Sequence, residues 1–223
     1  MALPLGSVAR SVDAFLQQGG RRGAGWSLHP AAWIGIVFFC AGCYGATMAA
    51  YFGFGDDRMW MVLFGVVKVP MLFVATLALA VPFFYVLNIL VGVGDDFATV
   101  RGALVDYQLA VAIQLAALAP VTVVVNYSES RYESAQAWST LMFAIAAWNA
   151  RRSLTQTYAE LEVTRPTHRW LRHTWFALYA FVGVQMAWTL RPFIGNPELP
   201  AQFFRDTIGN AYVNVGRVLM RFF

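Results

Sequence analysis

Long apolar stretches, separated by short polar segments, run through most of the chain. The longest covers residues 59–93, and its only charged side chain is Lys68. As a helix it would measure roughly 52 Å, which exceeds the hydrocarbon core of a bilayer, about 30 Å, but is too short for two spans. We therefore predict one long helix, bent at Pro82, where proline removes a backbone hydrogen bond.

The other apolar stretches predict four further membrane spans. Polar or helix-breaking residues bound each stretch, and tryptophans typical of the membrane interface flank several of them. The sequence thus predicts an all-α fold, a polytopic transmembrane helix bundle over residues 29–190. Its five spans are expected at residues 31–54, 59–93, 103–126, 137–150 and 175–190.

Residues 1–28 are expected to precede the bundle on the cytoplasmic side. Apolar residues recur at helical spacing over residues 1–18, with Arg10 and Asp13 on the other face, and a glycine-rich basic linker follows. The pattern is typical of an amphipathic helix on the membrane surface, and a solvated tail is the alternative.

Residues 191–223 are predicted to form an outer turn and a last amphipathic helix. The turn is built from Arg191, Pro192, Gly195 and Pro197, because proline stops the fifth span and the Gly-Asn-Pro sequence closes a turn. In the helix, six apolar side chains share one face, which suits either lipid or a protein partner. They are Phe203, Phe204, Ile208, Tyr212, Val215 and Leu219.

Composition supports a membrane protein, because 59% of the residues are apolar and only 13% are charged. Basic residues outnumber acidic ones by 16 to 12. Such an excess indicates nucleic acid in a soluble domain, but here the arginines lie beside apolar stretches, where they set orientation. We therefore expect no nucleic-acid partner.

Charge also predicts the topology. If residues 59–93 cross once, the N-terminal tail, Arg101 and the basic segment 151–174 all lie on one side, as the positive-inside rule requires. Arginine is used almost to the exclusion of lysine, as in many bacterial proteins. We expect a multi-pass protein of the cell inner membrane, with the N-terminus in the cytoplasm and the C-terminus on the outer side.

Small residues recur at every fourth position of the first expected span. This spacing lines one face of a helix with short side chains and lets a second helix approach closely. The second helix can belong to the same chain or to another chain. The residues of this helix-packing face are Ala41, Gly45, Ala49 and Gly53.

A few polar side chains lie inside the expected spans and form a candidate intramembrane polar site. Lys68 is placed near mid-bilayer, and Asp106 about one turn from the cytoplasmic end of its span. Buried ionisable groups are costly and often functional. Two interpretations stay open: a structural role, with a polar neighbour for Lys68, or a path for ions or small solutes. The set comprises Lys68, Asn88, Asp106, Gln114 and Gln185.

Other residue types that often carry chemistry are dispersed along the chain. Cys40 and Cys43 form a CxxC motif in mid-span without a second cysteine pair, so we interpret them as buried packing residues. His168 and His173 are out of register for one helix face and are interpreted as interface histidines. Asp96 is interpreted as a loop residue. We therefore expect no catalytic residue, metal site or cofactor.

Two segments resemble the Yip1-domain superfamily of five-span membrane proteins. One is the helix end PFFYVLNILVG at residues 82–92, and the other is the Ala119-Pro120 pair near the end of the third span. The resemblance covers about residues 66–184. The segment WTLRPFIGNP at residues 188–197 is similar to a group of uncharacterised bacterial membrane proteins. The Yip1 resemblance implies a non-enzymatic scaffold that binds other membrane proteins, and it carries over no catalytic residue.

These observations favour a non-catalytic integral membrane protein that serves as a scaffold or subunit of a membrane complex. It would assemble with other chains or with itself through the small-residue face and the C-terminal helix. The alternative is a channel or transporter that uses Lys68, Asn88, Asp106 and Gln185. A membrane-embedded enzyme would need titratable groups gathered at one depth, which the sequence does not place.

Overall fold

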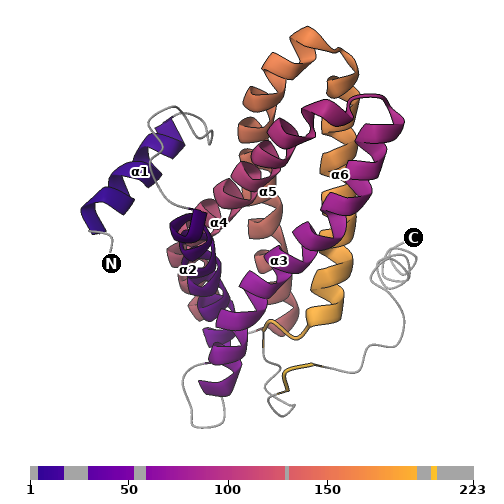
Figure 1. Ribbon diagram of the computed structural model, residues 1–223. Helices are drawn as coiled ribbons and strands as arrows, with labels where there is room; N and C mark the ends of the chain where they lie inside the picture. The colour runs from indigo at the N-terminus through magenta and orange to yellow at the C-terminus, as the bar shows by residue number, and fades with distance from the viewer. Residues whose placement is uncertain (1–4, 18–29, 53–58, 129–130, 195–201, 205–223) are drawn as a thin grey trace.

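A computed structural model of the protein describes residues 5–17, 30–52, 59–128, 131–194 and 202–204 (Figure 1). The described residues form α-helices and short 3-10 turns, with no strand among them, which confirms the predicted all-α class. The α-helices are α1 Leu5–Gln17, α2 Pro30–Ala49, α3 Met59–Leu90, α4 Phe97–Ser128, α5 Tyr132–Thr164 and α6 Thr167–Leu190. The 3-10 turns are η1 Ala50–Phe52 and η2 Gly94–Asp96.

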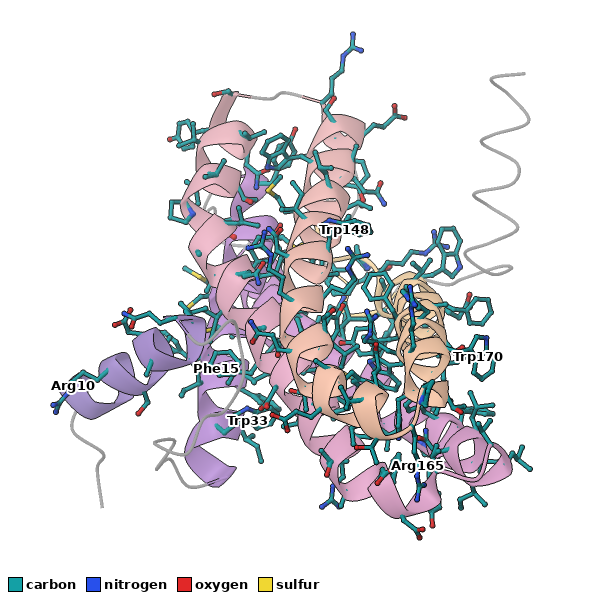
Figure 2. The ribbon with its side chains drawn as sticks, turned by 90° about the horizontal axis from the view of Figure 1, so that it is seen from above. Arg10, Phe15, Trp33, Trp148, Arg165 and Trp170 are labelled. Carbon is teal, nitrogen blue, oxygen red and sulfur yellow. The ribbon has the colours of Figure 1, made fainter. Side chains whose placement is uncertain are left out.

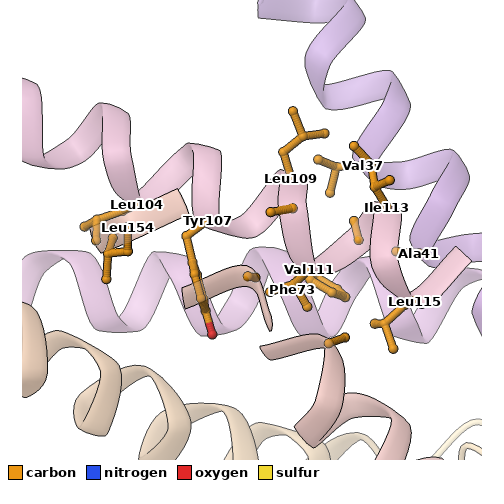
Figure 3. Packing of buried hydrophobic residues seen from close by; sticks show 14 of the residues in the cluster. Val37, Ala41, Phe73, Leu104, Tyr107, Leu109, Val111, Ile113, Leu115 and Leu154 are labelled. Atoms are coloured by element: carbon orange, nitrogen blue, oxygen red, sulfur yellow. The ribbon is translucent and has the colours of Figure 1, made fainter. Parts of the chain in front are cut away.

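Helices α2 to α6 form a closed ring of neighbours. Going round the ring, α2 packs against α3, α3 against α6, α6 against α5, α5 against α4, and α4 against α2. Side chains fill its centre, among them Phe73 of α3, Leu104 and Tyr107 of α4 and Leu154 of α5 (Figure 3). The ring therefore has one apolar core to which every one of these helices contributes.

The bundle has two ends that differ in charge. The connections α3–α4 (residues 91–96) and α5–α6 (residues 165–166) lie at one end (Figure 1). The exposed Arg101 and Arg169 lie near the starts of α4 and α6, and the exposed Arg152 lies twelve residues before the end of α5. We call this the basic end. The α4–α5 connection and the end of α6 lie at the opposite end.

Helix α3 is one continuous helix of 32 residues, with Pro70 and Pro82 inside it. The prediction of one long helix is confirmed, although it ends at Leu90 and not at residue 93. A Schellman motif stops it: Gly92 has φ +81°, and the N–H groups of Gly92 and Val93 donate to the carbonyls of Ile89 (3.0 Å) and Asn88 (2.9 Å). Only glycine adopts this left-handed conformation without a steric penalty.

The sequence indicated a loop for the basic segment 151–174, between the fourth and fifth expected spans. The structure shows that this segment is mostly helical. Helix α5 continues through it to Thr164, and α6 already begins at Thr167. The apolar run ends at Ala150, but Leu154 and Tyr158 keep the buried face at helical spacing. Because Arg, Gln and Glu are good helix formers, nothing between Arg151 and Thr164 breaks the helix.

Helix α1 packs on the bundle and is not a solvated tail. Phe15 belongs to the buried apolar cluster, whereas Arg10 and Asp13 on its other face are exposed. Figure 2 shows Phe15 directed toward the bundle and Arg10 directed away from it. The amphipathic pattern therefore forms the predicted helix, and its apolar face contacts protein.

Two of the described helical segments are long and apolar enough to cross a membrane, Met59–Leu90 and Gly94–Ser128. The apolar part of α2, Trp33–Ala49, is shorter. Large apolar side chains stand exposed along the full length of α3, which is expected where lipid replaces water. They include Trp60, Leu63, Val67, Val74, Phe83, Val86 and Leu90. These features support membrane association of the chain.

Candidate functional site

The small-residue face of α2 packs against α3 of the same chain. Ala41 and Ala49 are buried, and Gly45 faces Gly65 so closely that a Cβ atom on Gly45 would overlap the Gly65 carbonyl oxygen. A Cβ atom on Gly65 would lie 2.7 Å from that of Ala49. The two backbones meet because neither glycine has a side chain. The described part of this face is thus covered inside the chain and is not accessible to a second chain.

Lys68 of α3 is fully buried, and its ammonium group donates a hydrogen bond of 2.7 Å to the carbonyl oxygen of Pro192. The ammonium nitrogen also lies 4.9 Å from the ring centre of Phe203 and 5.9 Å from that of Phe64. The two rings meet edge to face at 5.1 Å. A carbonyl dipole and two aromatic faces therefore stabilise the buried charge. A backbone acceptor for this lysine was not predicted from the sequence.

The turn that follows α6 is held at several points. The guanidinium of Arg191 stacks on Trp188 at 3.4 Å, Pro192 accepts the bond from Lys68, and Tyr132 of α5 donates a 3.5 Å bond to the Ile194 carbonyl. The turn is thus fixed to both α3 and α5. Several residues of the predicted turn, packing face and C-terminal surface lie outside the described residues: Gly53, Gly195, Pro197, Ile208, Tyr212, Val215 and Leu219.

The remaining residues of the candidate polar site do not gather around one point. The Asn88 side chain donates to the Phe84 carbonyl of its own helix at 2.7 Å, and it lies about 30 Å along α3 from Lys68. Asp106 is buried on α4, whereas Gln114 and Gln185 are only half-buried. Positions so far apart in depth do not outline a single site.

Gln108, which the sequence analysis missed, is the buried polar residue that links three helices. Its amide nitrogen donates to the Phe73 carbonyl of α3 at 2.8 Å, and its amide oxygen accepts from the Tyr179 hydroxyl of α6 at 2.9 Å. A second, longer link joins α4 to α2, where Asn126 donates to the Thr47 carbonyl at 3.2 Å. The available signal for Gln108 was an amide side chain at the start of an apolar run, two residues after Asp106.

At the basic end, one carboxylate joins the two helix connections. Nε2 of the fully buried His168 lies 2.9 Å from Oδ2 of Asp96, and it must carry the proton because a carboxylate only accepts. Arg165 approaches the same oxygen at 3.4 Å and donates to the Gly92 carbonyl at 3.4 Å. Asp96 and His168 are therefore structural partners. Asp96 lies in the α3–α4 connection, and its pairing with His168 was not predicted from the sequence.

Tyr158 packs edge-on against His168, with ring centres 6.0 Å apart. Burial raises the pKa of its phenol well above the usual value, an effect that Glu162 reinforces and Arg172 opposes. Its hydroxyl makes no hydrogen bond within the described chain. Arg172 in turn donates to Glu162 at 2.8 Å and to Thr155 at 3.3 Å. These contacts tie α6 to α5 beside the charged connection.

Within the residues that the structure describes, no three His, Cys, Asp or Glu side chains are grouped as metal ligands. On α2, Cys40 is half-buried and Cys43 is exposed, so Cys43 is not the buried packing residue that the sequence predicted. The contacts found here join helices to one another. They are the bonds of a structural framework.

No family model matches the chain, and no curated protein or solved structure matches it.

Proposed function

We propose that the chain is a multi-pass membrane protein that serves as a scaffold or subunit of a membrane complex, without a reaction of its own. One observation carries the proposal: buried polar side chains bond to backbone carbonyls of other helices or of the turn after α6. Lys68 bonds to Pro192, Gln108 to Phe73 and Asn126 to Thr47. Such bonds tie helices together where lipid offers no alternative partner. The resemblance to the Yip1-domain superfamily points in the same direction and stays a prediction.

We further propose that α2 to α6 contain the five spans, with that of α5 at residues 137–150, and that the basic end faces the cytoplasm of a bacterial cell. The 20 residues of α2 measure about 30 Å, the thickness of a hydrocarbon core. The exposed arginines of the basic end satisfy the positive-inside rule. This orientation places the start of α2 in the cytoplasm and the end of α6 on the outer side of the inner membrane.

Partner chains would bind on surfaces other than the small-residue face, which α3 covers. The outward apolar face of α3 and the segment that begins at Phe203 and Phe204 are two such surfaces. Phe204 is exposed beside Phe203, at a ring distance of 4.8 Å. The C-terminal segment thus remains the proposed site of assembly.

The test is the native mass of the full chain, expressed at its natural level, solubilised in a mild detergent and purified with all bound chains. We expect a complex that contains chains of other sequences. A monomer free of partners would contradict the proposal. A homo-oligomer that conducts ions in liposomes would favour the channel alternative, and Lys68→Ala would then alter the ion flux without altering the oligomer.

A further inference from the structure

One face of α5 changes from apolar to cationic along its length. Leu141, Ile145, Trp148, Arg152 and Thr155 are spaced by three or four residues, which places them on one side of a helix. Leu141, Ile145 and Trp148 are 48%, 36% and 58% exposed. The opposite side of α5 is buried in the bundle, as the low exposure of Met142, Ala146 and Ala150 shows. The apolar side chains of this stripe therefore point out of the protein.

The cationic part of the stripe has no carboxylate of its own. Arg151 stacks its guanidinium over Trp148 at 3.9 Å, and Arg152 is exposed next to it. Within the described chain neither of them forms an ion pair, in contrast to Arg165 and Arg172, which bond to Asp96 and Glu162. Two neighbouring positive charges thus remain available to an anion.

A side chain from α6 closes the end of the stripe. The Thr155 hydroxyl donates to the Arg151 carbonyl at 3.0 Å and accepts from Nη1 of Arg172 at 3.3 Å. Arg172 is itself held by Glu162 at 2.8 Å. The position of Arg172 is therefore set by α5, and its charge is largely compensated.

We infer that this stripe binds an anionic phospholipid, with the acyl chains along Leu141 and Ile145 and the phosphate at Arg151 and Arg152. The inference rests on the membrane location in the proposed function. Ile145 and Arg152 are about 10 Å apart along the helix, the distance from the hydrocarbon core into the headgroup region. Trp148 lies between them, at the level where tryptophan is enriched in membrane proteins.

The order of the side chains selects the ligand class. A free phosphate would use the arginines but not the exposed apolar side chains, and a zwitterionic lipid would use the apolar side chains but gain little from two arginines. A lipid with a net negative headgroup uses both. Each arginine near an anionic headgroup contributes about a fivefold gain in affinity.

The experiment is a titration of the purified full chain in neutral detergent, followed by native mass spectrometry. Phosphatidylglycerol and phosphatidylcholine with the same acyl chains serve as the two probes. We expect the wild type to prefer phosphatidylglycerol, and the variant R151A/R152A to bind it about 25-fold more weakly with unchanged binding of phosphatidylcholine. Millimolar inorganic phosphate should not displace the bound lipid.

The matched control is R101A/R169A, which removes two exposed arginines of the same end from α4 and α6. We expect less than a twofold change in this variant. Equal losses in the two variants, equal binding of the two lipids by the wild type, or displacement by phosphate would each overturn the inference. Carbonate extraction of the same variants distinguishes the two proposals. A chain released by carbonate would refute the membrane location. A chain that stays in the membrane but shows no lipid preference would refute only lipid binding at the stripe.

Discussion

The ammonium group of Lys68 donates a 2.7 Å hydrogen bond to the carbonyl oxygen of Pro192, 124 residues further along the chain. Lys68→Met removes the donor and keeps most of the length of the side chain. We expect the free energy of unfolding to fall by about 1–3 kcal/mol, because a buried carbonyl is left without a partner. Hydrogen exchange should accelerate at residues 191–194. Denaturant unfolding and exchange mass spectrometry measure the two effects.

Val67→Ala is the control for Lys68, since Val67 is the adjacent residue of α3 and is exposed. It should leave exchange at residues 191–194 unchanged. If Lys68→Met leaves this segment protected but abolishes an ion current in liposomes, the lysine serves conduction and not the turn.

The contact of Gly45 with Gly65 makes a second prediction. Gly45→Ala places a methyl group where the Gly65 carbonyl oxygen lies, so α2 and α3 must separate. Overpacking of this kind costs about 1–3 kcal/mol or more. Gly35→Ala on the same helix is the control, because no heavy atom lies within 4 Å of its new methyl group. Thermal unfolding should show a loss for the first variant and none for the second.

Gln108 provides a test of the central polar link. Gln108→Leu removes the bonds to the Phe73 carbonyl and to the Tyr179 hydroxyl. Bonds between helices in membranes contribute about 0.6–2 kcal/mol, and we expect a loss of that size in the free energy of unfolding. Gln114→Leu, at a half-buried position of the same helix, should cost nothing. A double-mutant cycle with Tyr179→Phe should show coupling, and additive effects would contradict the link.

Much of the helical pattern was predictable, because apolar runs and prolines are local signals. The stretch of residues 59–93 was too short for two spans, and α3 is one helix. The extent of α5 was not predicted, because the apolar run ends at Ala150 whereas the helix does not. Beyond Ala150 the residues still favour a helix, and Leu154 and Tyr158 continue its buried face at helical spacing. Hydropathy locates the membrane part of a helix but not its end.

The contacts of the polar residues were harder to predict. Asp96 and His168 are 72 residues apart in the chain, and no spacing rule connects them. The acceptor for Lys68 is a backbone carbonyl, which carries no sequence signature. What could be predicted was the list of polar positions inside apolar stretches. Which of them meet depends on the order of the helices around the ring.

Asp96 is predicted to hold the two connections of the basic end together. Asp96→Ala removes the acceptor for His168 and Arg165 and leaves a buried imidazole N–H unbonded. We expect a loss of about 1–3 kcal/mol in the free energy of unfolding, together with faster hydrogen exchange at residues 91–96 and 165–168. Asp95→Ala, at the exposed neighbour in the same 3-10 turn, should change neither. Equal effects of the two substitutions would show that net charge, and not the pairing, matters.

Tyr158 predicts a dependence of stability on alkaline pH. Its pKa in the folded protein is raised above the unfolded value of about 10. Folding therefore favours the neutral phenol. The stability that the neutral phenol provides is fully present below about pH 10 and is lost as the pH rises toward the raised pKa. Tyr158→Phe cannot ionise, so it should retain more stability than the wild type at pH 11 and differ little at pH 8.

Tyr127→Phe is the control, because Tyr127 is 93% exposed at the end of α4. It should lose stability at pH 11 as the wild type does. Unfolding by denaturant at the two pH values measures both variants. Identical pH profiles for Tyr158→Phe and the wild type would show that Tyr158 is not a source of the alkaline loss.

The continuity of α5 has a mechanical consequence. The helix runs for 33 residues from Tyr132 to Thr164 without an internal proline, about 50 Å of stiff rod. One end carries Tyr132, which bonds to the Ile194 carbonyl, and the other leads into Arg165 and His168. Because α5 is stiff and packs on both α4 and α6, a displacement at one end is passed to the other. In the orientation proposed above, a single helix thereby joins the two faces of the bilayer.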